Sequence, residues 1–107
     1  MSINGPNDIS VASTLEKMGM AQFRVGKLAS ARRYLEDAVD MYRECGRDDI
    51  EPKLVSPLFV IGNIHSFMKN EEEAERVWRE AHKYNLQLGD DKNDQVHEVL
   101  CDALKIQ

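Results

Sequence analysis

Five side chains in this sequence belong to the types that most often bind metals or act as nucleophiles. They are His65, His82, His97, Cys45 and Cys101. Short ligand spacing marks a zinc site, as in two cysteines separated by two residues or two histidines separated by three, and no pair here has it. His65 and both cysteines lie on apolar stripes, so we expect a hydrogen-bonded core histidine and two small core-filling thiols. The sequence therefore predicts no metal site.

The acidic runs of the sequence do not form a pattern typical of acid–base catalysis. Glu71 to Glu73 open a predicted helix, where negative charge suits the positive end of the helix dipole, and Asp90-Asp91 lie in a predicted loop. The sequence has no glycine-rich phosphate loop, no G-x-S-x-G and no H-E-x-x-H. We therefore expect no catalytic residues and no cofactor, and the chain is predicted not to be an enzyme.

Length and composition favour one small all-α domain. The chain has 107 residues, 42% of them hydrophobic and 31% charged, and its aromatic share of 7% is low for a β-sandwich or barrel. A net charge of −5 argues against nucleic acid and against an anionic membrane surface as partners. No apolar run is long enough for membrane insertion.

Cysteine usage and the N-terminal residues indicate a location. Two cysteines are too few for a disulfide framework, and residues 1–8 have neither a basic patch nor an apolar signal core. We expect a cytoplasmic protein, or an organellar one if a transit peptide has been removed.

Apolar residues recur at three- and four-residue steps in five segments, which predicts five helices. Polar loops are expected at Gly46–Pro52 and at Gly89–Asn93, with Pro57 in the first turn of the third helix. The predicted buried stripes are Val11, Leu15, Met18 and Val25; Leu28, Ala31, Leu35, Ala38, Tyr42 and Cys45; Leu54, Leu58, Ile61, His65 and Met68; Ala74, Val77, Trp78, Ala81 and Leu88; and Val96, Val99, Leu100, Ala103 and Leu104.

The first four predicted helices form an internal repeat with an offset of 43 residues. Gly19 pairs with Gly62 in this alignment, and each glycine falls inside a helix, where it costs about 1 kcal/mol relative to alanine. We expect both glycines to permit close approach of the paired helix. The other matched pairs are Ser13 with Ser56, Leu15 with Leu58, Ala31 with Ala74, Arg33 with Arg76, Ala38 with Ala81, and Gly46 with Gly89.

The repeated pattern resembles the tetratricopeptide repeat family. Its residues are Leu15, Met18-Gly19, Phe23, Ala31, Leu35 and Ala38 in the first copy, and Leu58, Ile61-Gly62, His65, Ala74, Trp78 and Ala81 in the second. The family's terminal proline is absent, since Arg43 and Leu86 occupy those places, and the spacing exceeds the usual length of about 34 residues. In both respects the chain resembles the long-repeat branch exemplified by kinesin light chains. The resemblance implies a solenoid of antiparallel helix pairs. Its expected divisions are a tail at 1–8 and one domain at 9–107, with repeats at 9–46 and 53–89 and a capping helix at 94–106.

The resemblance also implies a partner-binding groove on the first helix of each repeat. The groove residues carried over are Glu16, Met20, Phe23 and Arg24 from the first helix, and Phe59, Asn63, Ser66 and Phe67 from the third. Glu16 and Met20 stand where family members that capture a chain-terminal carboxylate have lysine and asparagine, so this mode of capture is not expected.

The function that the resemblance implies is a non-catalytic adaptor or scaffold that binds a peptide or a partner helix. The alternatives are a structural subunit or assembly factor of a larger complex, and a regulatory subunit of an enzyme. Self-association through charge is a further option, because basic residues gather in the first half and acidic ones in the second. The basic residues are Arg24, Lys27, Arg32, Arg33, Arg43, Arg47 and Lys53.

Overall fold

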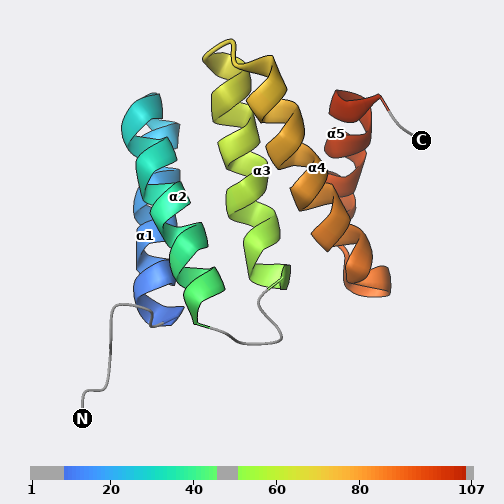
Figure 1. The fold of residues 1–107 in the computed structure, drawn as a ribbon, viewed down its shortest axis with the longest axis horizontal. Coiled ribbons are helices and arrows are strands. Elements are labelled where there is room, and N and C mark those ends of the chain that lie inside the picture. Colours follow the sequence, from blue (N-terminus) through green and yellow to red (C-terminus); the bar gives the residue numbers. More distant parts are fainter. Residues whose placement is uncertain (1–8, 46–50, 106–107) are drawn as a thin grey trace.

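The computed structural model describes residues 9–45 and 51–105, and the regular elements within these ranges are all helical (Figure 1). The α-helices are α1 (Ile9–Arg24), α2 (Leu28–Glu44), α3 (Glu51–Phe67), α4 (Glu71–Gln87) and α5 (Asp94–Leu104), and a 3-10 turn, η1 (Gly89–Asp91), precedes α5. The predicted all-α class is therefore confirmed. The predicted loop at Gly89–Asn93 contains this 3-10 turn.

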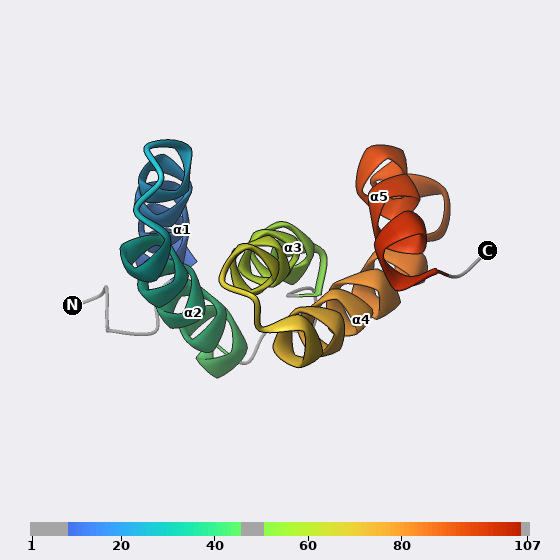
Figure 2. The ribbon, with the colours of Figure 1, turned by 90° about the horizontal axis from the view of Figure 1, so that it is seen from above.

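The helices pack in sequence as antiparallel pairs. α1 packs on α2 and α3 on α4, while α2 also contacts α3 and α4 contacts α5. Seen from above, α1, α3 and α5 line one side of a curved layer and α2 and α4 line the other (Figure 2). We call the side lined by α1, α3 and α5 the concave face. The arrangement is that of a helical solenoid with two pairs and a fifth helix at the end.

The 43-residue repeat is visible in the helix boundaries. α2 (Leu28–Glu44) and α4 (Glu71–Gln87) have the same length, and both their first and their last residues are 43 positions apart. The last residues of α1 and α3 are separated by the same number of positions. The turns within the two pairs correspond as well, because Gly26 has a φ of 84° and its counterpart Lys69 has a φ of 67°. The second pair thus reproduces the left-handed turn of the first without a glycine.

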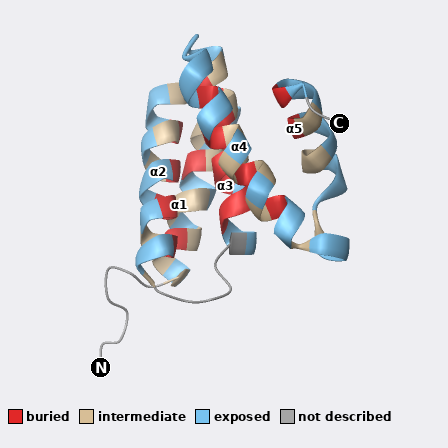
Figure 3. Cartoon of the chain, turned by 45° about the vertical axis from the view of Figure 1, so that its right-hand side comes forward, coloured by how far each residue is buried: buried red, intermediate tan, exposed pale blue. Residues whose placement is uncertain are grey.

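Small residues bring the paired helices together, as predicted. Ala31, Ala38, Ala74 and Ala81 are fully buried on α2 and α4. A Cβ atom added to Gly19 would lie 2.7 Å from Cγ of Leu35, and one added to Gly62 would lie 2.3 Å from Cδ1 of Trp78. Both glycines therefore make room for a large side chain of the partner helix. Buried residues gather where the helices face one another (Figure 3).

Several residues of the predicted stripes are exposed. Val25 is 68% exposed and Met18 42%, which excludes both from the core, and Met68 and Val99 are exposed as well. Val25 and Met68 come directly after α1 and α3 end, where no partner helix covers them. Ala103 faces solvent too, since only Leu100 and Leu104 of α5 are buried.

The start of α3 also differs from the prediction. α3 begins at Glu51, so Glu51 and Pro52, which were expected in the loop at Gly46–Pro52, are helical. Residues 46–50, with Gly46 and Arg47, lie outside the described part. Pro57 is consequently inside the helix and fully buried, not in the first turn. The buried residues Leu54 and Val55 explain the longer helix, since they extend its apolar side by a turn before Pro57.

Candidate functional site

The eight predicted groove residues lie on α1 and α3, the helices of the concave face (Figure 2). Arg24 and Phe67 are exposed, and the other six are half-buried: Glu16, Met20, Phe23, Phe59, Asn63 and Ser66. None of the eight is fully buried, so each retains some surface through which it can contact a partner.

An aromatic contact joins α1 and α3 on this face. The ring centroids of Phe23 and Phe67 are 6.1 Å apart, with 34° between the ring planes. Phe67 nevertheless remains 64% exposed. An aromatic ring of this exposure, held by a second ring, is a preformed apolar contact surface.

A shallow depression lies along α1, the helix that carries Phe23. It is lined by Ser13, Glu16, Lys17, Met20 and Arg24. Three of these belong to the predicted groove set, and they combine one apolar side chain with charges of both signs. The depression can therefore accept an apolar side chain flanked by polar groups.

Glu16 has an internal role besides its place on this surface. The Tyr42 hydroxyl of α2 donates a hydrogen bond of 2.9 Å to Glu16 Oε1. Burial raises the pKa of Glu16 even though this hydrogen bond lowers it, and burial together with Glu16 raises the pKa of Tyr42 to about 12. One carboxylate oxygen is thus committed to the α1–α2 contact, and this reduces what Glu16 can offer a partner.

Phe59 likewise contributes to the packing of the fold. It packs against the buried core, and its backbone carbonyl accepts a hydrogen bond of 3.3 Å from Trp78 Nε1. Phe67 lies two turns along α3 and is far more exposed. Of the two predicted aromatic groove residues on α3, Phe67 is therefore the one whose removal should disturb the core less.

The basic residues do not form one free patch. The Arg43 guanidinium of α2 pairs with the Glu80 carboxylate of α4, which also accepts a hydrogen bond of 3.1 Å from the Tyr84 hydroxyl. Arg43 therefore joins the two helix pairs. Arg47 lies outside the described residues.

The acidic run at the start of α4 has the surface character that was predicted. Glu71, Glu72 and Glu73 occupy the first turn and are exposed. Arg76 donates to Glu73 at 2.8 Å, and this hydrogen bond lowers the pKa of Glu73. These contacts are those of a solvated helix start.

The histidines and cysteines differ in part from their predicted roles. His65 is buried, as expected, but its Nδ1 has no hydrogen-bond partner among the described residues. Cys45 is half-buried against the core, whereas Cys101 lies beside His97, 3.7 Å from its Nε2. His82 of α4 joins them, and the ligand atoms of His82, His97 and Cys101 all lie within 4.8 Å of one another.

Sequence reasoning missed this group because it looked only for two cysteines or two histidines at short spacing. His97 and Cys101 are four residues apart, which places them one above the other on a helix. The third member, His82, comes from another helix and carries no local signal.

Comparison with known proteins identifies part of the chain. A family model described as "Tetratricopeptide repeat" matches residues 11–44, which span most of α1 and all of α2. Neither the curated proteins nor the solved structures give a match. In the part of the chain that the structure describes, no helix has the length and apolar character needed to cross a membrane.

Proposed function

We propose that the chain is a non-catalytic interaction module that binds an extended peptide or a partner helix on its concave face. The match of residues 11–44 to the tetratricopeptide repeat model supports this proposal. Helical-repeat proteins generally use their extended concave surfaces to bind other proteins. The observation that carries the proposal is the exposed Phe67 ring, which contacts Phe23 of α1, the helix whose side chains also line the depression.

The proposal assigns a role to each part of this surface. Phe23 and Phe67 provide an apolar anchor, Met20 an adaptable apolar wall, and Arg24 a cation that can pair with an acidic side chain of the partner. Gly19 and Gly62 let the paired helices pack closely, and a closely packed module should need little ordering of its own on binding.

The cellular setting belongs to the same proposal. Cys45 and Cys101 are both free thiols, which is typical of a reducing compartment. We therefore propose a cytoplasmic location.

The test is a selection of binding peptides against the full chain from a displayed library of random and helix-forming sequences. The affinity of each selected peptide is then measured for the wild type, for Phe67→Ala and for Leu86→Ala. Leu86 is a suitable control because it is also an exposed apolar residue, at 48%, but lies on α4. Truncating a central anchor typically costs about 2 kcal/mol or more, so we expect Phe67→Ala to weaken binding about 30-fold and Leu86→Ala to leave it within about twofold.

Equal affinity for both variants, or a selection that yields no binder, would contradict the proposal. The molecular mass in solution separates the alternatives further. A monomer with peptide affinity supports an adaptor, whereas a chain that is stable only as an oligomer or in a complex supports a structural subunit.

A further inference from the structure

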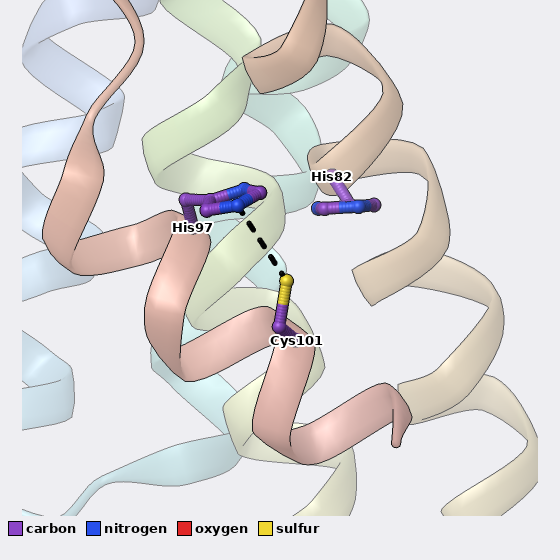
Figure 4. A group of neighbouring side chains, drawn as sticks. All are labelled: His82, His97 and Cys101. Carbon is purple, nitrogen blue, oxygen red and sulfur yellow. Dashed lines mark hydrogen bonds between the residues drawn. The ribbon is translucent and has the colours of Figure 1, made fainter. Parts of the chain in front are cut away.

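His82, His97 and Cys101 meet between α4 and α5, and none of them belongs to the residues assigned to partner binding (Figure 4). His97 and Cys101 lie one turn apart on α5, and His82 faces them from α4. Figure 4 shows both imidazole rings edge-on, one on either side of the Cys101 sulfur. The ring centroids are 5.3 Å apart, with 19° between the ring planes.

The spacing of these atoms suits a tetrahedral cation. With zinc–nitrogen and zinc–sulfur bonds of about 2.1 and 2.3 Å, two ligand atoms of a tetrahedral site lie about 3.6 Å apart. His97 Nε2 and Cys101 Sγ are separated by 3.7 Å. The third ligand atom lies within 4.8 Å of both, so that a small side-chain rotation of His82 would complete the set.

Neither histidine ring is engaged through its Nδ1 atom by another group of the described residues. Nδ1 of His82 and Nδ1 of His97 are buried and have no hydrogen-bond partner in the described ranges, so no other group there fixes either ring through that atom. Burial, and to a smaller extent His97, lowers the pKa of His82 and so favours the neutral form of its ring. A neutral imidazole is the form that coordinates metals.

Two hydrogen bonds join the end of α4 to the start of α5 near this group. The side-chain amide of Asn85 donates to the Asn93 carbonyl at 3.0 Å and accepts from the Asn93 amide at 2.9 Å. Asn85 is fully buried, and Asn93 in turn caps α5 by accepting from the Val96 amide. Since His82 lies one turn before Asn85 and His97 one turn after Asn93, this contact fixes the two histidines opposite each other.

We propose that His82, His97 and Cys101 bind a divalent cation of the zinc class, which joins α5 to α4. Two imidazoles and a thiol select zinc or a similar borderline-soft ion over calcium and magnesium, which prefer oxygen ligands. The thiol proton passes to solvent as the sulfur–metal bond forms. Three protein ligands leave one coordination position for water or for a ligand from a partner.

The test is a titration of the metal-free, reduced full-length chain with Co²⁺, followed by displacement with Zn²⁺. Co²⁺ bound through a thiolate gives a charge-transfer band in the near ultraviolet, which reports on the cysteine. We expect saturation at one ion per chain. Cys101→Ser should remove the band, and His82→Gln should weaken binding at least about tenfold.

Cys45→Ser is the matched control, because Cys45 is the second half-buried thiol and its Sγ donates to the Tyr42 carbonyl, which a serine hydroxyl can also do. This variant should keep the band. Zn²⁺ should raise the melting temperature of the wild type and of Cys45→Ser by several degrees, and should leave that of Cys101→Ser unchanged.

Far-ultraviolet circular dichroism checks that each variant keeps its helices. His82→Gln gives an independent test if Cys101→Ser loses helicity, because it removes a ligand from α4 and leaves α5 intact. Absence of saturable binding in the wild type would overturn the proposal, as would a band that survives Cys101→Ser. A band that needs Cys45 with one ion per two chains would overturn it as well, since the ion would then join two copies.

Discussion

Replacing Gly62 by alanine tests how closely α3 and α4 must approach. The added Cβ would lie 2.3 Å from Cδ1 and 2.4 Å from Nε1 of Trp78. Carbon atoms in contact are separated by about 3.5 to 4.0 Å, so the indole ring has to move. That movement breaks the hydrogen bond of 3.3 Å from Trp78 Nε1 to the Phe59 carbonyl.

The expected magnitude combines three effects. Overpacking a core costs about 1 to 3 kcal/mol, and loss of the hydrogen bond costs about 1 kcal/mol. Alanine regains about 1 kcal/mol as the better helix former. The net loss in the free energy of unfolding is therefore about 2 kcal/mol, or roughly 10 °C in melting temperature for a domain of this size.

Thermal and urea unfolding followed by circular dichroism measure this loss. The control is Ala21→Gly on the exposed side of α1, which gives the glycine–alanine difference where the Cβ meets solvent. A second background is Trp78→Leu, which reproduces the Gly19–Leu35 pairing of the first repeat. Gly62→Ala should be less destabilising in that background. Stabilisation of the otherwise wild-type chain by Gly62→Ala would refute the close-packing argument.

Two further predictions concern the turn and the buried carboxylate. Lys69 has a φ of 67°, and a left-handed conformation costs a residue with a Cβ about 1 to 2 kcal/mol. Lys69→Gly should therefore raise the melting temperature, whereas the control Lys83→Gly within α4 should lower it. A lower melting temperature for Lys69→Gly would contradict the turn assignment. Burial raises the pKa of Glu16, so the ionised carboxylate destabilises the folded chain at neutral pH, and this penalty disappears as pH falls through the folded pKa toward the unfolded one. Glu16→Gln should therefore be more stable than the wild type at pH 7, and urea unfolding at a series of pH values should show this difference in stability shrinking toward pH 4. A difference that grows toward pH 4 would contradict the inferred direction of the pKa shift of Glu16.

The pairing of the helices could be predicted from sequence because its signals are local and occur twice. Gly19 and Gly62 fall at the same place in the two copies, and the buried alanines of α2 and α4 repeat with them. A glycine inside a helix is costly, so its recurrence indicates close approach of another helix.

Burial near helix ends could not be predicted in the same way. Val25 and Met68 continue the apolar spacing of α1 and α3, but each comes just after its helix ends and is exposed. Periodicity shows which residues share a face, whereas burial depends on whether a second helix reaches that far. The interior position of Pro57 was missed because a proline is more often found in a first turn.

The cluster at the α4–α5 interface shows a second limit of sequence reasoning. His97 and Cys101 share a helical face, a spacing that could have been noticed. Nothing in the sequence indicates that His82 faces them, because this depends on the contact between Asn85 and Asn93. For the predicted groove residues, the helices that carry them could be predicted, but the internal contact of Glu16 with Tyr42 could not.

The most direct test of the proposed function is a map of where a selected peptide binds. Amide chemical shifts of the isotope-labelled chain would be recorded during titration with the tightest peptide from the selection. Binding on the concave face predicts that the largest changes cluster on α1 and α3 around Met20, Phe23 and Phe67, with little change on the exposed side of α2. Changes centred on α2 and α4 would contradict the account.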